Sequence, residues 1–586
     1  MSLPTNATTP RSGPALVRVP FAGSQTDADG TTPEVPDARS EQVGPRVRPT
    51  TLEWVVLLGA AGWIVLLLLL RWPALLYPQF NSNSNIDAAF FALAGKLVRD
   101  GAVPYLAFWD HKPPLIYLIN AFALSLSSGG VWGIWVVTVA AFAATLGLAW
   151  RAWRPTVGPT AAIVGMTWVA ASVGLVAPFN LTEGYVLPVH AGAMLLMTRW
   201  SPLRRRVVVS GLVVGALAGL AFMLRPNFVG APAVVMAMMV IGLLTTRQPR
   251  KLAVWVTGVV VGVALTIAPI LVWLGTQNAL RPFLEQVFSY NATYVAASWS
   301  ARARAAFEGV ATTSTYGTLL LPISGWVLAL RRLVVRRRGA TPTPVLWFAV
   351  LWLPVEVALA AVPGRTYMHY FATLLLPFGL LTGIAACEVF AIIARVAAPA
   401  VAGRWRRHIA LVVCGVIAVV PVGRTLIELR DSGLRGERAE QVDATAHYVR
   451  AHSARDSRLL VWGHAADVYF FADREPASRF VYPLAMLTPR YADSSLVAGF
   501  VDELRANAPP LIVDATPGVA KSEALVPSLA SWNPRWRYPT SGVAWWTMTP
   551  ALRAFYDYVA SSYAPVDVVG PQKWVIYARR TGPEMR

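Results

Sequence analysis

The sequence predicts an all-helical membrane domain of the polytopic kind, with about 11 transmembrane helices, followed by a C-terminal α/β domain. Three observations predict this. Of the 586 residues, 55% are hydrophobic and only 14% are charged, against about 25% charged in ordinary soluble proteins. Long apolar runs recur between 52 and about 423, where we count only nine acidic residues. From 424 to 586 the composition becomes that of a soluble domain. This composition excludes a soluble cytosolic enzyme.

The charge balance is strongly basic, but its distribution indicates a membrane and no nucleic acid. There are 51 Lys+Arg against 31 Asp+Glu, a net charge of +20. Between 51 and 424 the arginine clusters fall in short gaps between apolar runs, as they do in loops of membrane proteins. Residues 1–51 are rich in Pro, Ser, Thr and Gly, so we expect a disordered cytoplasmic tail. Both cysteines, Cys387 and Cys414, lie inside apolar runs, so no disulfide framework is expected.

The topology follows from the apolar runs and the positive charges. Runs that can span a bilayer are centred near residues 62, 141, 168, 192, 215, 237, 264, 322, 353, 382 and 416. The stretch from Pro113 to Leu126 has about 14 residues, which is short for a crossing. If it re-enters or lies in the interface, every arginine-rich loop falls on one side, which the positive-inside rule makes cytoplasmic. We therefore expect a cytoplasmic N-terminus, an external C-terminal domain and, from the Ala, Arg and Val usage, a bacterial inner membrane.

The first outer loop carries the most specific local signal. A run of N-cap residues, 81–87, precedes Ala88 to Val98, where Phe90, Leu93 and Leu97 share one face. This predicts an amphipathic helix lying on the membrane, with Asp87 in its first turn, where the helix dipole favours the carboxylate. Further on, Lys112 precedes two prolines, which hold it in an extended conformation. A fixed cation beside a carboxylate at headgroup level suits an anionic, phosphate-bearing lipid.

These residues resemble the GT-C superfamily of integral membrane glycosyltransferases, in the branch that holds protein mannosyltransferases, aminoarabinose transferases and lipopolysaccharide-core sugar transferases. The specific part is the acidic residue that opens a helix after the first span, a Gly-x-x-Pro-Tyr turn at 101–105 and Trp-Asp-His-Lys-Pro-Pro-Leu at 109–115. Less specific pieces lie at 180–185, 224–226, 290–294 and 365–370. The resemblance covers 52 to about 423.

The resemblance implies that a sugar is transferred from a polyprenyl-phosphate donor to a glycan, lipid or protein acceptor on the outer face. It implies that Asp87 is the catalytic base and that Lys112 contacts the lipid phosphate. Several relatives have two adjacent acidic residues at the first position. Here Asp87 lies between Ile86 and Ala88, so we expect no metal ion and no other cofactor.

Other polar residues of the same outer loops are candidates for the site. Arg225 and Arg365 lie at the outer boundary, and a guanidinium can bind phosphate through two hydrogen bonds, so both are candidates for the donor phosphate. The candidates for substrate or acceptor binding are Asp110, His111, Glu183, Tyr290, Asn291, Tyr367, His369 and Tyr370. Direct displacement by a single base predicts inversion at the anomeric carbon.

Each assignment has a structural alternative. Asp87 can serve only to stabilise a helix N-terminus, Lys112 can extend to the headgroups from a buried stem, and Arg225 can simply end a span. Glu183 can be a solvated loop charge and His369 a packing residue. For His190, within an apolar run, we expect a hydrogen bond in the core.

The C-terminal region predicts a small α/β domain that caps the site and helps to select the acceptor. We expect helices at 438–452 and 494–506, a segment at 469–472, and strands at 459–462, 479–482, 511–513, 543–547 and 574–577. His464, Asp467 and Tyr469 can line a cleft over the membrane site, although a surface cluster is the favoured interpretation.

Two other classes of function stay open. A flippase or transporter of lipid-linked sugars would usually show internal repeats, and we find none. A non-catalytic scaffold with an external binding domain would leave the pairing of Asp87 with Lys112 unexplained.

Overall fold

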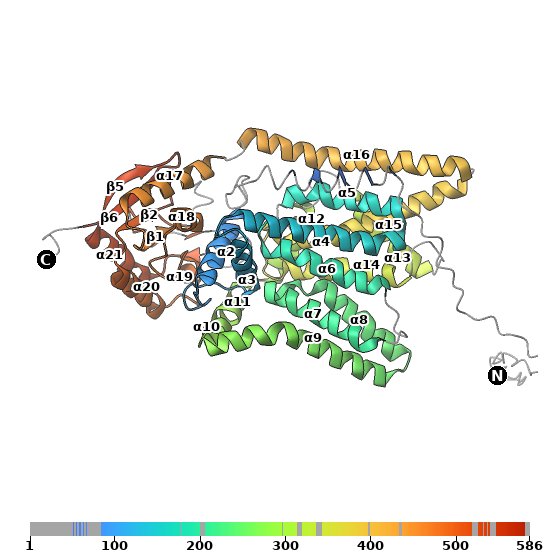
Figure 1. Cartoon of the computed structure of the whole chain (residues 1–586), viewed down its shortest axis with the longest axis horizontal. Helices are drawn as coiled ribbons and strands as arrows, with labels where there is room; N and C mark the ends of the chain where they lie inside the picture. The colour runs from blue at the N-terminus through green and yellow to red at the C-terminus, as the bar shows by residue number, and fades with distance from the viewer. Residues whose placement is uncertain are drawn as a thin grey trace, which may run out of the picture. The chain divides into compact units, whose positions relative to one another are not determined.

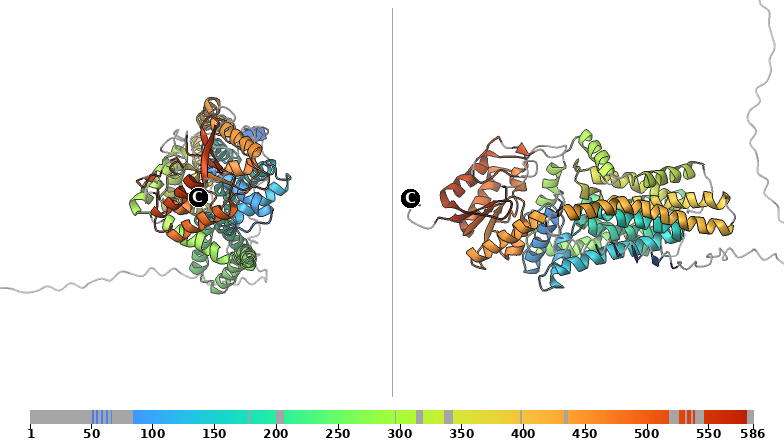
Figure 2. Two further views of the ribbon diagram at one scale, coloured as in Figure 1. Left: turned by 90° about the vertical axis from the view of Figure 1, so that its left-hand side faces the viewer. Right: turned by 90° about the horizontal axis from the view of Figure 1, so that it is seen from above.

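A computed structural model describes residues 84–176, 179–199, 206–295, 297–312, 319–335, 343–396, 399–432, 436–517, 526–530, 532–535, 537–538 and 546–580, with isolated positions between 51 and 66. The predicted tail 1–51 lies almost wholly outside the described residues. The described chain is mostly helical, with its strands near the C-terminus, as Figures 1 and 2 show. The long helices run alongside one another and the sheet lies beyond one end of them.

The part of the helical bundle that the structure describes contains ten long helices. They are α4 (Trp132–Val157), α5 (Pro159–Val176), α6 (Thr182–Arg199), α7 (Val207–Leu224), α8 (Gly230–Thr245), α9 (Pro249–Thr276), α13 (Leu320–Val335), α14 (Thr343–Ala361), α15 (Leu375–Val396) and α16 (Pro399–Ser432). Ten of the eleven predicted span centres fall on these helices, and the centre near 62 lies where only isolated residues are described.

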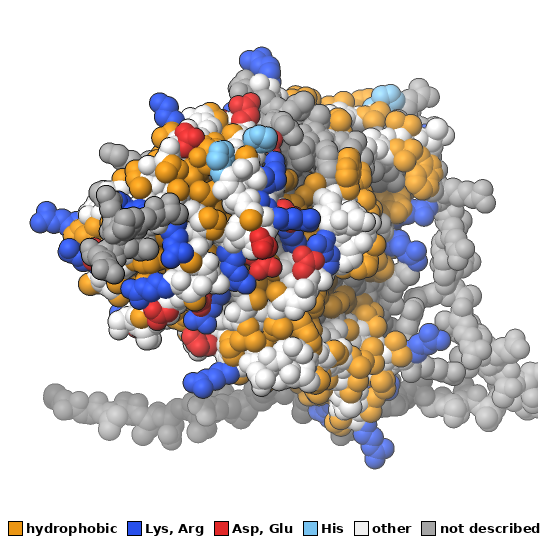
Figure 3. Space-filling view, turned by 60° about the vertical axis from the view of Figure 1, so that its left-hand side comes forward, with side chains coloured by type: hydrophobic (Ala, Val, Ile, Leu, Met, Phe, Trp, Pro, Cys, Tyr) orange, Lys and Arg blue, Asp and Glu red, His pale blue; other side chains and the backbone are white. Residues whose placement is uncertain are grey.

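Six described helices are long and apolar enough to cross a membrane, namely Trp132–Val157, Val207–Leu224, Pro249–Thr276, Pro344–Ala361, Met368–Val396 and Trp405–Arg424. Many of their apolar side chains face outward, including Val260 and Leu265 of α9 and Val416 of α16, and apolar side chains cover much of the bundle surface in Figure 3. Such surfaces are stable in lipid. The chain is therefore a multi-pass membrane protein, and the number of eleven spans stays a prediction.

Helices α7 and α9 pack backbone to backbone. A Cβ at Gly211 would lie 2.3 Å from the carbonyl oxygen of Trp255, and a Cβ at Gly262 would lie 2.1 Å from that of Leu212. Small residues at such interfaces let two membrane helices approach closely. The two helices lie on one side of the bundle, and Arg225 directly follows the last residue of α7.

The segment predicted to be the first outer loop, a name that we keep below, forms two helices, α2 (Ser84–Arg99) and α3 (Leu115–Ser125). α3 has 11 residues, about half of what a span needs, which agrees with the expectation that this stretch does not cross. The prediction that α2 is amphipathic is wrong over residues 88–94, whereas its place on the membrane surface stays a prediction. Residues 88–94 are all buried, because α2 packs against both α3 and α18. The stretch Ala-Ala-Phe-Phe-Ala-Leu-Ala is apolar on every face, which is the pattern of a buried helix.

The remaining helical elements described before residue 436 are shorter than the long helices of the bundle. They are η2 (Pro226–Phe228), α10 (Leu280–Leu284), η3 (Glu285–Ser289), α11 (Tyr290–Tyr294), α12 (Trp299–Thr312) and η4 (Met368–Leu374).

The C-terminal region has a four-stranded mixed sheet with strand order β1-β2-β6-β5. β1 (Leu459–Trp462) and β2 (Leu511–Asp514) are parallel, while β6 (Trp574–Arg579) is antiparallel to β2 and to β5 (Tyr563–Val569). A second pair joins β3 (Arg537–Tyr538) to β4 (Trp546–Thr547). The helices are α17 (Gly436–His452), α18 (Ala466–Ala472), α19 (Leu484–Leu487), α20 (Ser494–Asn507), η5 (Pro550–Leu552) and α21 (Arg553–Ser562).

The region contains the predicted mixture of helices and a small sheet, with one strand placed wrongly. No strand forms at 479–482. There the carboxylate of Glu503 accepts hydrogen bonds from the hydroxyl of Ser478 and the backbone NH of Arg479, and the carbonyl of Arg479 accepts one from the backbone NH of Trp109. The backbone of this segment thus hydrogen-bonds the first outer loop and does not pair with a strand of the sheet.

The sheet domain and the first outer loop share one hydrophobic core. Phe90 of α2 packs edge-on against Tyr482, with ring centroids 4.9 Å apart, and Trp109 packs edge-on against Tyr290 of α11 at 4.8 Å. Each such aromatic contact is worth about 0.5–1.5 kcal/mol beyond its buried area. Lys96 of α2 also forms an ion pair with Asp473, the residue that directly follows α18. These contacts fix the C-terminal domain over Asp87 and Lys112.

Candidate active site

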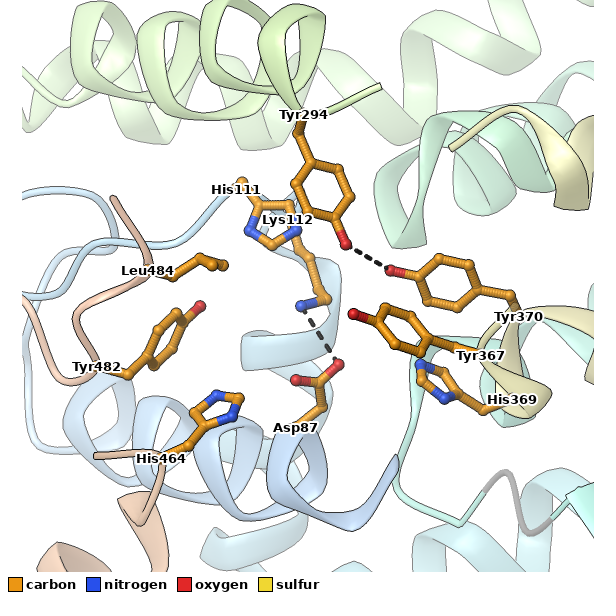
Figure 4. A pocket seen from close by; sticks show the side chains of 10 residues that line it. All are labelled: Asp87, His111, Lys112, Tyr294, Tyr367, His369, Tyr370, His464, Tyr482 and Leu484. Atoms are coloured by element: carbon orange, nitrogen blue, oxygen red, sulfur yellow. Dashed lines mark hydrogen bonds and ion pairs between the residues drawn. The ribbon is translucent and has the colours of Figure 1, made fainter. Parts of the chain in front are cut away.

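A cavity of about 60 Å³ lies where the first outer loop, the bundle and the C-terminal domain meet. It is lined by Asp87, His111, Lys112, Tyr294, Tyr367, His369, Tyr370, His464, Tyr482 and Leu484. Figure 4 shows Asp87 and Lys112 between two walls, with His464, Tyr482 and Leu484 on one side and Tyr367, His369 and Tyr370 on the other. Residues far apart in the sequence thus surround one carboxylate and one ammonium group.

Asp87 and Lys112 form the central ion pair of this cavity. Nζ of Lys112 lies 3.6 Å from Oδ2 of Asp87 and 5.0 Å from the ring centroid of Phe91. The Asp87 side chain keeps 27% of its surface exposed, whereas that of Lys112 keeps 8%. Asp87 stands in the first turn of α2, and therefore near the positive end of that helix dipole. The carboxylate is the more accessible member of the pair.

Lys112 is held in place by a strained turn. Tyr105 adopts φ = +71°, a left-handed conformation that costs a non-glycine residue about 1–3 kcal/mol. Two hydrogen bonds hold Tyr105 in this conformation. Its hydroxyl donates to the carbonyl of Lys112 at 2.8 Å, and its backbone carbonyl accepts from the side-chain amide of Gln286 at 2.9 Å. Asn291 donates to the carbonyl of His111 at 2.7 Å. The backbone that carries the cation is therefore fixed on both sides of Lys112.

Asp110 is a buried carboxylate that organises the loop. Its side chain is 0% exposed, and it accepts hydrogen bonds from the hydroxyls of Tyr117 at 2.5 Å and Tyr482 at 2.7 Å. Its Oδ1 lies 4.0 Å from Nζ of Lys112. Burial raises the pKa of Asp110, but the charge of Lys112 and the hydrogen bonds outweigh burial and hold that pKa well below its usual range. Asp110 is therefore ionised and joins the first outer loop to the C-terminal domain.

The electrostatic environment keeps the central pair charged. Burial raises the pKa of Asp87, but the ammonium of Lys112 outweighs it, and the pKa is lowered overall. Burial lowers the pKa of Lys112, but Asp110 and Asp87 outweigh it, and the pKa is raised. Burial and Lys112 lower the pKa of His111. At neutral pH the cavity thus holds one carboxylate, one ammonium group and a neutral His111.

The opposite wall comes from η4 and α11. The hydroxyls of Tyr294 and Tyr370 lie 3.2 Å apart, and the rings of Tyr367 and His369 are stacked with centroids 5.9 Å apart. The guanidinium of Arg365 lies 4.8 Å from the ring centroid of Tyr294. It is buried, and its Nε and Nη1 have no hydrogen-bond partner among the described residues. This leaves a cation directly behind the tyrosine wall.

Arg225 has a different environment from the one predicted. Its Nη1 donates to Oε1 of Glu183 at 2.8 Å, and both side chains are buried. Its guanidinium lies 3.8 Å from the ring centroid of Tyr370. Glu183 is thus no solvated loop charge. It is the buried counter-ion of an arginine that supports the cavity wall.

Six of the predicted site residues line the cavity: Asp87, His111, Lys112, Tyr367, His369 and Tyr370. The other six lie in the layer behind them. Tyr290 hydrogen-bonds the hydroxyl of Thr488, Asn291 fixes the backbone of His111, and Asp110, Glu183, Arg225 and Arg365 have the contacts described above. The roles assigned to all twelve stay predictions.

Four cavity residues are absent from the predicted set: Tyr294, His464, Tyr482 and Leu484. The preferred surface interpretation of His464 was wrong, since it lines the cavity, whereas Asp467 and Tyr469 are buried inside the domain. Asp467 pairs with Arg438, and the hydroxyl of Tyr469 accepts from the backbone NH of Val461. No local sequence pattern marks His464, Tyr482 and Leu484 as site residues, because only the fold brings them to Asp87.

The fold is similar to that of integral membrane transferases of the GT-C type. A helical membrane bundle has a long first loop that packs under a mixed α/β domain and presents an acid at a helix start beside a lysine. The resemblance found in the sequence is therefore confirmed for the fold. Among the described residues, no group of three or more His, Cys, Asp or Glu side chains is arranged to hold a metal ion, and the absence of a metal stays a prediction.

Comparison with known proteins gives the particular relatives in fold. No protein-family model matches the sequence, and no curated protein matches it. The crystal structure of ArnT from Cupriavidus metallidurans bound to undecaprenyl phosphate is similar over 91% of this chain and 100% of that chain, with 16% identity and a TM-score of 0.53. Its apo state is similar over 90% and 100%, with the same identity and TM-score. The archaeal oligosaccharyltransferase AglB from Archaeoglobus fulgidus is similar over 79% and 69%, with 12% identity and a TM-score of 0.47.

Proposed function

We propose that this protein is a glycosyltransferase that moves a sugar from a polyprenyl-phosphate-linked donor to an acceptor at the outer face of the membrane. The observation that carries the proposal is the pairing of Asp87 with Lys112, 3.6 Å apart, in a cavity between the bundle and the C-terminal domain. Undecaprenyl phosphate was bound to ArnT in the structure that resembles this one, and this supports a lipid phosphate as part of the ligand.

In the proposed reaction, the acceptor hydroxyl attacks the anomeric carbon of the donor sugar. A bond forms between the acceptor oxygen and that carbon while the bond from the carbon to the phosphate oxygen breaks. The electron pair leaves with the polyprenyl phosphate, and the hydroxyl proton passes to Asp87. The lowered pKa of Asp87 makes it a weak base, so proton transfer comes late, after the glycosidic bond has largely broken. One displacement inverts the anomeric centre.

Lys112 supplies the positive charge for the departing phosphate in this mechanism. The hydroxyl of Tyr105 holds the backbone carbonyl of Lys112 and two carboxylates hold its ammonium group, so little reorganisation is needed as charge develops. Arg365 is a second candidate, because two of its buried guanidinium nitrogens have no partner among the described residues. Arg225 acts indirectly, since Glu183 and the Tyr370 ring already hold it.

We propose that the chain lies in a bacterial inner membrane, with residues 1–51 as a cytoplasmic tail, 52–423 as the membrane domain and 424–586 as an external domain. The reaction is proposed to need no metal ion, since Lys112 and Arg365 can provide the charge stabilisation.

The test is a transfer assay with the purified full-length protein in detergent. The donors are a panel of undecaprenyl-phosphate hexoses and pentoses, and the readout is the release of undecaprenyl phosphate, which is common to every sugar. Asp87→Asn should lower release by about 10²- to 10⁴-fold, the usual contribution of a positioned base. Asp100→Asn is the matched control, because Asp100 is exposed just beyond the other end of α2 and pairs with Arg99.

Unchanged release in the Asp87→Asn protein would remove Asp87 as the base. If the wild-type protein neither released nor bound undecaprenyl phosphate, the glycosyltransferase proposal itself would be wrong. Loss of activity on addition of a chelator, with recovery on addition of a divalent ion, would overturn the metal-independent form.

A further inference from the structure

A second cavity, of about 40 Å³, adjoins the first on the side of the C-terminal domain. It is lined by Gly463, His464, Tyr482, Pro483, Leu484, Leu487 and Val526. His464, Tyr482 and Leu484 line both cavities and stand together beside Asp87 in Figure 4. The cavity begins where β1 ends at Trp462, and Val526 lies in the connection that follows β2. Crevices at the carboxyl ends of parallel strands are the usual ligand sites of α/β domains.

Several contacts position the His464 ring at the boundary between the two cavities. Gly463 has φ = +132°, which permits the turn that sends the chain from β1 toward the first cavity. Nη2 of Arg438 donates to the carbonyl oxygen of His464 and to the Asp467 carboxylate, each at 3.3 Å. The ring packs against Tyr482 with centroids 5.1 Å apart. Its Nδ1 is buried and has no hydrogen-bond partner among the described residues.

His464 is neutral at physiological pH. Burial, together with the charges of Lys112 and Arg438, outweighs Asp87 and Asp110 and lowers the pKa of His464 to about 4. A neutral imidazole has one N–H donor and one acceptor nitrogen. Such a ring beside Asp87 can donate a hydrogen bond to a hydroxyl oxygen without competing for the hydroxyl proton.

The second cavity has mostly apolar walls. Besides His464 and the Tyr482 ring, its lining side chains are Pro483, Leu484, Leu487 and Val526. Its volume of about 40 Å³ is more than the roughly 10–15 Å³ that a cavity needs to hold one water molecule. A water molecule there would lack most of its partners, whereas a short alkyl group would fill it.

We propose that this crevice is the acceptor subsite, in which His464 hydrogen-bonds the nucleophilic oxygen and the apolar cavity takes a short alkyl group on the neighbouring carbon. The inference rests on the proposed function and narrows its substrate class. The acceptor is an alcohol in which the carbon that bears the reacting hydroxyl also bears a small apolar substituent. A sugar ring with a hydroxyl group on every neighbouring carbon lacks such a substituent. His464 donates to a lone pair of the acceptor oxygen, Asp87 receives the hydroxyl proton, and polyprenyl phosphate leaves with the electron pair.

The test compares two small acceptors of similar size, 2-propanol and ethane-1,2-diol. Each is added to the full-length protein with an undecaprenyl-phosphate sugar that turns over, and the alkyl glycosides are measured by mass spectrometry. The wild-type protein should form the isopropyl glycoside at least about tenfold faster, because an apolar cavity disfavours the extra hydroxyl. Leu484→Asn should reduce this preference to about twofold or less, because it adds a polar group to the cavity wall.

The role of His464 is tested with His464→Gln and the control His452→Gln. His452 is exposed at the end of α17, where it stacks on Tyr448. His464→Gln should lower both transfers by about tenfold or more while the affinity for undecaprenyl phosphate stays within about twofold, since the ring contacts the acceptor and not the lipid phosphate. Equal rates for the two alcohols in the wild-type protein, or unchanged transfer by His464→Gln, would overturn the inference.

A measurement without donor keeps the inference separate from the proposed function. In Leu484→Cys, the new thiol is allowed to react with methyl methanethiosulfonate or with the charged 2-sulfonatoethyl reagent. The ratio of the two reaction rates should favour the uncharged reagent by at least about tenfold over the same ratio in the protein unfolded in detergent, because a charge is excluded from an apolar crevice. The wild-type protein, whose Cys387 and Cys414 are buried, gives the background. An equal ratio would overturn the apolar subsite, whereas failure to bind undecaprenyl phosphate would count only against the proposed function.

Discussion

Nζ of Lys112 lies 3.6 Å from Oδ2 of Asp87 and 4.0 Å from Oδ1 of Asp110. The lysine therefore has one accessible partner at the cavity and one fully buried partner behind it. The buried partner also accepts two tyrosine hydroxyls, which leaves Asp87 as the partner that can turn toward a substrate. A phosphate that enters the cavity can approach the ammonium group while Asp110 continues to hold it in position.

This arrangement predicts that Lys112→Gln weakens binding of undecaprenyl phosphate by about 10- to 100-fold, since hydrogen bonds to a charged group contribute about 1.5–3 kcal/mol. The dissociation constant of the purified protein in detergent, measured by calorimetry or by lipid displacement, checks this. Lys251→Gln, in the first turn of α9, is the control. Equal affinities for the wild-type protein and Lys112→Gln would show that the phosphate binds elsewhere.

The pH dependence of transfer follows from the same pair. Because Lys112 lowers the pKa of Asp87 below 3.8, the carboxylate is already ionised at the pH where an ordinary aspartate would titrate. Transfer should therefore show no acid limb from Asp87 above pH 3.8. In Lys112→Gln the burial of Asp87 is no longer opposed by that charge, so its pKa should rise and the acid limb should move to higher pH. Rate profiles of the two proteins check this, and identical acid limbs would contradict it.

Asp110 predicts an effect on stability that is separate from ligand binding. Asp110→Asn replaces a buried acceptor of two hydroxyl hydrogen bonds with an amide and leaves Lys112 with a single counter-ion. The loss should be about 3–5 kcal/mol, as when one partner of a buried charged network is removed. Tyr482→Phe removes one of these hydrogen bonds and should cost about 1–2 kcal/mol.

The midpoints of thermal unfolding of these variants in detergent give the comparison for Asp110. Tyr491→Phe is the control, because the Tyr491 hydroxyl accepts from Trp109 and donates to Glu285, each at 3.2 Å, in a partly exposed position. If Asp110→Asn unfolded at the same temperature as the wild-type protein, the carboxylate would not organise the loop.

The sequence alone was sufficient to predict the structural features that depend on a local pattern of residues. The start of α2 with Asp87 in its first turn, the strand Leu459–Trp462 and the position of Lys112 before two prolines are all properties of short segments. It was insufficient where a residue's role depends on a distant partner. Glu183 has the appearance of a loop charge until Arg225 is folded against it, and 479–482 alternates like a strand although its backbone pairs with Trp109.

The same reasoning explains why the acceptor side of the cavity was missed. Tyr482 reaches Asp110 across 372 positions of sequence, and contacts of that separation leave no periodic trace. The amphipathic interpretation of α2 failed for a related reason. It considered the face of Phe90, Leu93 and Leu97 and did not weigh Ala89 and Phe91, which are equally buried because α3 and α18 cover the helix from two sides.

Gly463 is the residue that directs His464 into the cavity. Its φ of +132° lies in a region that other residues enter only at a cost of about 1–3 kcal/mol. A Cβ there would also lie 3.2 Å from Cβ of Ala515, the residue that follows β2. Gly463→Ala should therefore shift the turn, reduce transfer to the acceptor by about tenfold and leave binding of undecaprenyl phosphate unchanged. Gly499→Ala is the matched control, since a Cβ at that position in α20 meets no atom closer than 4.0 Å and alanine favours a helix. Acceptor transfer and lipid binding, measured on the same preparations, separate the two sides of the cavity. A Gly463→Ala protein that lost lipid binding to the same extent as transfer would indicate that the turn supports the whole cavity and has no special role at its acceptor side.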